Sequence, residues 1–172
     1  AAPAWDHRTM NLRRAIVDGV RIQMVSGTHV LLLRDADEAR YLPIPIGPNE
    51  ATSISYHLQG INPERPLTHD TALRAIRTLG AAVREVRITE LRDETFRACM
   101  VMVSPAGEVA ELDTRPSDAV AIALRADAPI FIATDLLAAE GIVPEAAEEE
   151  RLSLFRDFVN SLDGDESPRG DG

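Results

Sequence analysis

The order of strand-like and helix-like segments constrains the fold of this chain more than any other feature. Strand-like runs extend to residue 46, helix-like runs follow at 49–58 and 68–79, and strand-like runs then return. This order has no steady strand–helix–strand repeat, which disfavours a doubly wound parallel sheet. The sequence therefore predicts an α+β fold in a single domain, with a mixed and largely antiparallel sheet flanked by helices.

Turn-forming residues divide the strand-like runs and indicate how the strands pair. A polar turn at 35–40 and a turn with Pro and Gly at 105–107 favour two antiparallel hairpins. Pro43 and Pro45 lack the N–H group that a sheet hydrogen bond needs, so their strand is expected at a sheet edge or at a bulge. Gly19 is a candidate bulge in the first strand. The predicted strands cover 12–24, 30–33, 41–46, 83–91, 95–103, 108–112 and 129–133.

Start and stop signals define the predicted helices. Asn49 and Thr68 are expected N-caps, and Gly60 and Gly80 are expected to end the same helices. Pro116 suits the first turn of a third helix, because a proline there needs no N–H partner. The predicted helices of the main body cover 49–58, 68–79, 116–125 and 134–141.

The two ends of the chain differ from its middle. We interpret residues 1–11 as an N-terminal leader, 12–143 as the folded domain, and 144–172 as an amphipathic helix with an acidic, disordered tail. Residues 135–172 hold 11 acidic and 3 basic residues, whereas 1–134 hold 17 and 15. The apolar stripe of the helix predicted at 148–162 suits docking on the body or on a protein partner.

Composition excludes several classes of protein. With 45% hydrophobic and 27% charged residues, the chain is not fully disordered. No apolar run approaches the roughly 18 residues of a membrane span, and the single Cys99 has no cysteine to pair with, so we expect a soluble, cytoplasmic protein without membrane attachment. The net charge of −10 disfavours binding of nucleic acid by phosphate neutralisation alone. All 18 basic residues are nevertheless Arg, whose planar fork binds phosphate bidentately.

The segment RPLTHD, residues 65–70, places chemistry at a helix start. Free N–H groups and a positive partial charge make such a start a seat for anions. His69 has the titration range of a general base, and Asp70 would orient it or bind a metal ion. The alternative is that Thr68 and Asp70 only stabilise the helix start and that His69 lies on the surface.

The segment DTRPSD, residues 113–118, repeats this pattern before the next long helix. Arg115 would clamp a phosphate, and Asp113 or Asp118 would hold a divalent cation. The alternative is again a helix cap, with Arg115 in a structural ion pair. Glu50, at another helix start, is either a third carboxylate for the metal ion or a partner of the helix dipole. The recurrence suggests that the two segments converge on one cleft.

These motifs together resemble the bifunctional nuclease family. The resemblance rests on YLPIPIGPNEA, RPLTHD, VREVRITELRDETFRA and LDTRPSDAVAIALRADAPIFIA, in that order, and covers roughly residues 15–143. It implies an α+β fold, a homodimer or higher homo-oligomer, and cleavage of both RNA and DNA. The chain departs from the family pattern at Pro45, Glu90 and Arg97. These three residues surround the segments RPLTHD and DTRPSD and do not belong to them. The matching polar positions are Glu50, Arg65, Thr68, His69, Asp70, Arg115, Ser117 and Asp118.

The resemblance and the motifs favour metal-assisted hydrolysis of RNA and DNA phosphodiesters. His69 would activate water, with Asp70 and Asp118 as further catalytic residues. Mg²⁺ or Mn²⁺ would be held by Glu50, Asp70 and Asp118. The phosphate would be bound by Arg65, Thr68, Arg115 and Ser117.

Two alternatives remain open at the level of sequence. The first is a non-catalytic, dimeric binding or regulatory module for a phosphate-bearing ligand or a protein partner. The second is an oligomerisation domain, with the same residues buried at a subunit interface. An open cleft that gathers the polar residues favours the enzyme, whereas separate surfaces or internal ion pairs favour a binding module.

Overall fold

A seven-stranded sheet in the order β3-β2-β1-β7-β4-β5-β6 forms the centre of the computed structural model, which describes residues 10–144. All neighbouring strands are antiparallel except β4 and β7, which are parallel. The predicted α+β fold with a mixed, largely antiparallel sheet is confirmed. The elements are β1 Leu12–Ile22, β2 His29–Asp35, β3 Tyr41–Ile46, α1 Pro48–Leu58, α2 Thr68–Thr78, β4 Ala82–Arg92, β5 Thr95–Val103, β6 Val109–Thr114, α3 Pro116–Ala126, β7 Ile130–Ala133 and α4 Thr134–Glu140.

The described chain as far as Ile142 forms one compact unit, and a separate unit begins at Val143. The helix predicted at 148–162 and the acidic tail lie outside the described residues. Among the residues that are described, no helix is both long enough and apolar enough to cross a membrane.

The sheet edge at β3 follows from its prolines. Pro43 and Pro45 occupy alternate positions opposite Leu32 and Val30 of β2, and β3 pairs with no other strand of the sheet. The prediction of an edge strand is therefore confirmed. The bulge expected at Gly19 is also present, because the register between β1 and β2 shifts between Val17 and Gly19.

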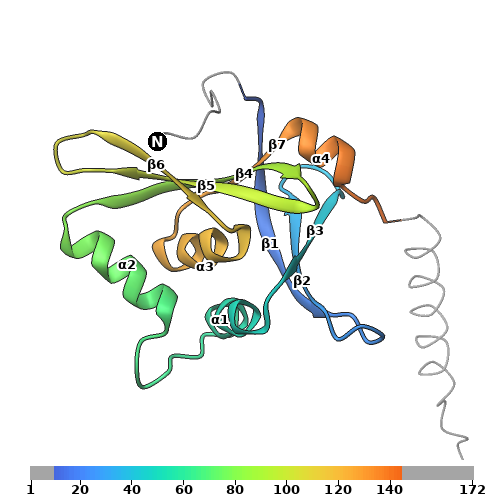
Figure 1. Ribbon diagram of the computed structural model, residues 1–172, viewed down its shortest axis with the longest axis horizontal. Helices are drawn as coiled ribbons and strands as arrows, with labels where there is room; N and C mark the ends of the chain where they lie inside the picture. Colours follow the sequence, from blue (N-terminus) through green and yellow to red (C-terminus); the bar gives the residue numbers. More distant parts are fainter. Residues whose placement is uncertain (1–9, 145–172) are drawn as a thin grey trace, which may run out of the picture. The chain divides into compact units, whose positions relative to one another are not determined.

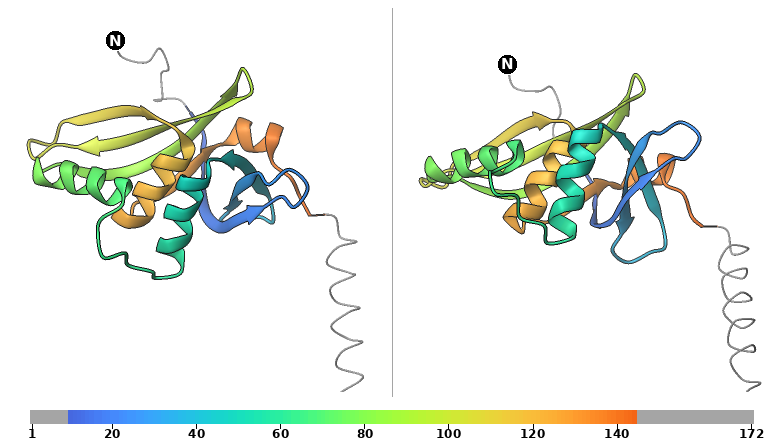
Figure 2. Two further views of the ribbon diagram at one scale, coloured as in Figure 1. Left: turned by 60° about the horizontal axis from the view of Figure 1, so that its bottom comes forward. Right: turned by 90° about the horizontal axis from the view of Figure 1, so that it is seen from below.

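Helices α1, α2 and α3 lie side by side against the sheet, with α3 in the middle (Figures 1 and 2). Helix α3 is buried on most of its surface, and its Ala119, Ala121 and Ala123 are completely buried. Small side chains at these positions allow neighbouring elements to approach closely. This packing brings the first turns of the three helices together.

The helix starts differ in detail from the predicted caps. Helix α1 begins at Pro48, one residue before Asn49, because proline suits the first helical position. Thr68 is the first residue of α2 and not its N-cap. The N–H of Leu67 instead donates to the Asp70 carboxylate at 2.8 Å, which is the acidic half of a capping box.

Candidate functional site

The starts of α2 and α3 meet through a hydrogen bond between His69 and Asp118. The distance from His69 Nε2 to Asp118 Oδ1 is 3.0 Å, although 49 positions separate the residues in the chain. The convergence of the two motifs, which the sequence suggested, is confirmed. The capping alternative placed His69 on the surface. The residue is instead only 8% exposed, so this part of the alternative is wrong.

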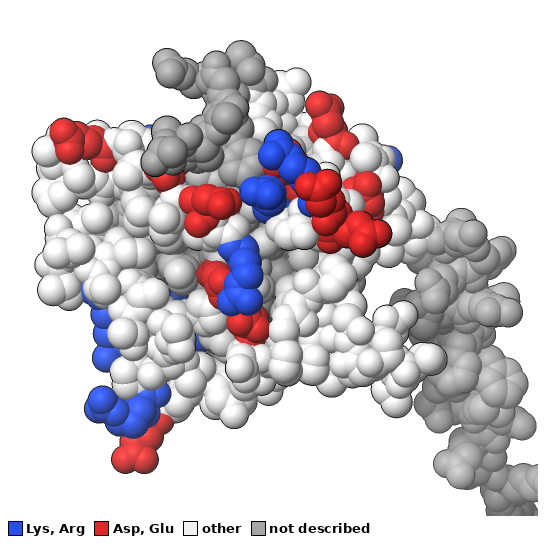
Figure 3. Space-filling model, viewed as in Figure 1, with Lys and Arg blue, Asp and Glu red and all other residues white. Residues whose placement is uncertain are grey.

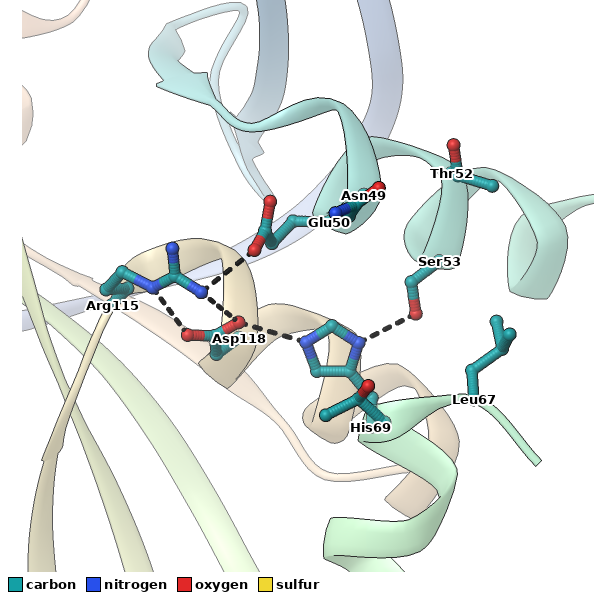
Figure 4. Close-up of a pocket in the computed structure, with 9 residues that line it drawn as sticks. Asn49, Glu50, Thr52, Ser53, Leu67, His69, Arg115 and Asp118 are labelled. Carbon is teal, nitrogen blue, oxygen red and sulfur yellow. Dashed lines mark hydrogen bonds and ion pairs between the residues drawn. The ribbon is translucent and has the colours of Figure 1, made fainter.

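A third residue, Ser53 of α1, completes a row of hydrogen-bonded groups (Figure 4). Its Oγ lies 2.8 Å from His69 Nδ1, so the imidazole ring is held between a hydroxyl and a carboxylate. Ser53 is not among the residues predicted from the sequence. Its position still carries a sequence signal. Ser53 lies beside the inward-facing Ile54 and about one helical turn after Glu50, so it is a small polar residue on the face of α1 that packs against the other helices.

The charge state of Asp118 fixes the hydrogen positions in this row. Burial alone raises the pKa of Asp118, but hydrogen bonds from Arg115 and His69 outweigh burial and hold the pKa below its ordinary value. An ionised carboxylate can only accept a hydrogen bond, so the hydrogen of neutral His69 is assigned to Nε2. Nδ1 is then the acceptor, and the Ser53 hydroxyl donates to it.

Arg115 joins the starts of α1 and α3. Its Nε and Nη2 donate to the two oxygens of Asp118 at 2.7 and 3.1 Å, and Nη2 also donates to Glu50 Oε1 at 2.9 Å. Its side chain is nevertheless 66% exposed, so part of the guanidinium faces solvent. Gly47 permits this arrangement, because a Cβ at that position would overlap the Glu50 carboxylate.

Asp70 is turned away from this row. Its Oδ1 accepts a hydrogen bond from Arg125 Nε at 2.6 Å, and its Oδ2 accepts one from the N–H of Leu67 at 2.8 Å. Arg125, with a side chain only 8% exposed, also donates to the carbonyl oxygens of Ser53 and Ala121. Arg125 was not predicted from the sequence, because a basic residue in the last turn of a helix is ordinarily explained by the helix dipole.

An open cavity of about 380 Å³ gives solvent access to this row of groups. Thr68, His69, Arg115 and Asp118 line it, together with Ser53. The remaining predicted phosphate-binding residues lie elsewhere. Arg65 is exposed before α2, and Ser117, 5% exposed, lines a neighbouring cavity.

The residues predicted to hold a metal ion do not form a suitable donor set here. Glu50, Asp70 and Asp118 are each the third residue of a helix, where an acid complements the dipole. Asp70 is bonded to Arg125, and the guanidinium of Arg115 stands between the other two carboxylates, where a cation would lie. In the described range 10–144, no three His, Cys, Asp or Glu side chains are grouped to hold a metal ion.

Charges of both signs alternate over the face drawn in Figure 3. Blue and red side chains lie next to each other there, and a large part of the face is uncharged. A mixed surface of this kind gives little long-range attraction for a polyanion.

Comparison with known proteins identifies relatives of the chain. A family model described as the bifunctional nuclease domain matches residues 31–145. A protein of Mycobacterium tuberculosis, named only as uncharacterized, is 38% identical over 87% of this chain and 94% of its own length. Bifunctional nuclease 1 of Oryza sativa subsp. japonica is 31% identical over 69% of this chain and 43% of its own length. Bifunctional nuclease 2 of the same rice is 28% identical over 83% and 44%, respectively.

Proposed function

The chain belongs to the bifunctional nuclease domain family, and from this membership we propose that its polar cavity binds and hydrolyses phosphodiester bonds of RNA and DNA. The observation that carries the proposal is the row Ser53–His69–Asp118–Arg115. In it, a hydroxyl, an imidazole, a carboxylate and a guanidinium are joined by hydrogen bonds in an open cavity. This row combines a candidate base, a group that orients the base, and a cation for phosphate.

Arg115 is the proposed phosphate ligand. Its guanidinium is exposed, and Nη1, the nitrogen that donates to neither Asp118 nor Glu50, would donate to a phosphate oxygen. The N-terminal ends of α2 and α3 meet at the cavity, and their partial positive charge favours an anion. Thr68, which lines the cavity at the first position of α2, adds a hydroxyl donor. Together these groups would stabilise the charge that develops on the phosphate.

His69 is the proposed general base, and it acts through Ser53. Asp118 holds the hydrogen on Nε2, so Nδ1 is the nitrogen that takes a proton. Water that attacks the phosphorus would give its proton to Ser53 Oγ while the Ser53 hydroxyl passes its own to His69 Nδ1. The imidazolium formed in this way is stabilised by Asp118 and would later lose its proton to solvent, while the departing oxygen, on the opposite side of the phosphorus, takes a proton from solvent.

No step of this scheme passes through a divalent cation. The sequence predicted Mg²⁺ or Mn²⁺ at Glu50, Asp70 and Asp118, but Arg125 and Arg115 already pair with these carboxylates. A cation would have to displace a guanidinium to bind there. Cleavage assays with EDTA, with Mg²⁺ and with Mn²⁺ test this point directly.

The proposal is tested by cleavage of labelled single- and double-stranded RNA and DNA. His69→Ala should lower the rate by about 10²–10⁴-fold, the usual contribution of a general base, and Asp118→Asn should also slow cleavage. His57→Ala is the matched control, because His57 is exposed on α1, outside the residues that line the cavity. Equal rates for wild type, His69→Ala and Asp118→Asn would contradict the proposal and point to a contaminating nuclease.

The second candidate is a non-catalytic module that binds a phosphate-bearing ligand or a protein partner. The ion pairs of Arg115 with Glu50 and Asp118 favour it, because they use part of the fork that a phosphate needs. Oligonucleotide binding without cleavage by wild-type protein would support this candidate. Assembly as a homodimer or higher homo-oligomer, a protein partner at 148–162 and a cytoplasmic location stay predictions from the sequence.

A further inference from the structure

We propose that a second cavity, which shares Arg115 with the first, binds a nucleobase of the same substrate. The inference rests on the proposed function, because it concerns the base attached to the bound phosphate. This base cavity has a volume of about 240 Å³ and lies between β3, the β4–β5 turn and the start of α3. The residues that carry the argument are Pro45, Glu94, Phe96, Arg115 and Pro116.

The walls of the base cavity have the chemistry that a base requires. Phe96 is half-buried and offers an aromatic ring, and Pro45 and Pro116 add rigid apolar surfaces. Unstacked bases in single-stranded nucleic acid are held mainly by stacking on such groups. Phe96 also packs against the hydrophobic core, which holds its side chain in the wall of the cavity.

The connection through Arg115 makes the two cavities parts of one site. A base and its phosphate are separated by a single sugar, so a base subsite must adjoin the phosphate ligand. Arg115 lines both cavities, and the next residue, Pro116, lines only the base cavity. A nucleotide whose phosphate contacts the exposed guanidinium would therefore reach the base cavity with its base.

The β4–β5 turn supplies a hydrogen-bond acceptor at this cavity. Arg92 pairs with Thr95, so Asp93 and Glu94 form a two-residue turn, with φ angles of 48° and 57°. Glycine or asparagine is usual in such turns, and a glutamate in the left-handed region is unfavourable. Backbone strain of this kind is common at ligand sites. Glu94 lines the base cavity, and its carboxylate can accept a hydrogen bond from an exocyclic amino group.

This contact gives a preference between two bases of nearly equal size. Cytosine presents an amino group at position 4, which a carboxylate accepts. Uracil presents a carbonyl oxygen at the same position, which a carboxylate repels. We therefore infer that oligomers of cytidine bind more tightly than oligomers of uridine.

The test compares the binding of three fluorescent oligomers of equal length: oligocytidine, oligouridine and an oligomer whose units lack the base. Fluorescence anisotropy is measured at low temperature with the full chain, and gels confirm that the probes stay intact. Phe96→Leu keeps an apolar side chain but removes the ring. It should weaken binding of oligocytidine by about 5- to 100-fold, the effect of losing one base stack, and leave the base-free oligomer unaffected.

Two further variants sharpen the result. Glu94→Gln should bring the affinities for oligocytidine and oligouridine close together, because an amide can both donate and accept. Phe131→Leu is the matched control, since Phe131 lies on β7 outside the base cavity and should not change the affinities.

The possible outcomes separate this inference from the proposed function. If Phe96→Leu weakens binding of all three oligomers equally, or of none, the cavity does not bind a base. The proposed hydrolysis is not affected by that result. Equal affinity of the wild type for cytidine and uridine oligomers would overturn the role of Glu94. If the wild type cleaves no substrate but Phe96→Leu weakens only oligomers with bases, hydrolysis fails and the base cavity stands.

Discussion

Replacement of Arg125 by Met should destabilise the domain by about 3 kcal/mol. Methionine retains much of the apolar stem, so the change isolates the guanidinium, which is bonded to Asp70, Ser53 and Ala121. Breaking a fully buried ion pair costs about 3–5 kcal/mol, because the remaining charge loses its partner. The Asp70 side chain is 27% exposed, so water offsets part of this loss and the lower end of the range applies.

Urea unfolding of the full chain measures this quantity. A loss of about 3 kcal/mol corresponds to a melting temperature lower by roughly 10 °C for a domain of this size. Arg77→Met is the matched control, because Arg77 is exposed in the last turn of the neighbouring helix α2. This replacement should change the free energy of unfolding by less than about 0.5 kcal/mol.

A double-mutant cycle identifies the partner. If Asp70 is the main partner, Asp70→Asn combined with Arg125→Met should cost clearly less than the sum of the single changes, with a coupling of about 1–2 kcal/mol. A cost below about 1 kcal/mol for Arg125→Met, or strict additivity of the two changes, would refute the reasoning.

Three further predictions concern other parts of the domain. The hydrogen bond from Arg13 lowers the pKa of buried Asp35, so the pair adds stability above the unfolded-state pKa of about 3.9, and this stability is lost as the pH falls. Urea midpoints between pH 6 and pH 2 should fall less steeply for Asp35→Asn than for wild type, and parallel curves would contradict this. Gly47→Ala should displace the Glu50 carboxylate and change oligonucleotide affinity with little loss of secondary structure by circular dichroism, whereas an unchanged affinity would argue against the contact. Burial raises the pKa of the Cys99 thiol to about 11, so the native protein at pH 8 should react with a disulfide reagent far more slowly than the unfolded protein, and equal rates would disprove burial.

Local sequence signals were sufficient to predict most of the elements of the fold. Alternate prolines marked the edge strand, and Pro116 marked the start of α3. The predicted N-caps were wrong: Gly47 and not Asn49 caps α1, because Pro48 takes the first helical position, and Leu67 and not Thr68 caps α2, because the Asp70 carboxylate binds the N–H of Leu67. The two predicted hairpins, β2–β3 and β5–β6, are confirmed, but the parallel pairing of β4 and β7 was not accessible, because it depends on packing between distant parts of the chain.

For the site, the sequence indicated the residue types but not their partners. His69 and Asp118 were placed together correctly, whereas Asp70 followed the same motif and turned to Arg125. Adjacent residues on a helix point about 100° apart, so the motif alone did not show that His69 faces Asp118 while Asp70 faces Arg125. For Ser53, the sequence indicates a position on the inward face of α1, but the contact of its hydroxyl with the imidazole depends on how closely α1 packs against α2.

The alanines of α3 have a consequence for how this site can evolve. The groups of the row come from separate helices, and the close approach of α3 to its neighbours depends on small side chains that are not part of the row. Ala119, Ala121 and Ala123 are completely buried, so one added methyl group would have to be absorbed by a shift of a neighbouring element. Such a shift would lengthen or shorten the contacts of the imidazole without altering any residue around it. The geometry of this row of groups is thus adjustable from the core, by changes at residues that do not belong to the row.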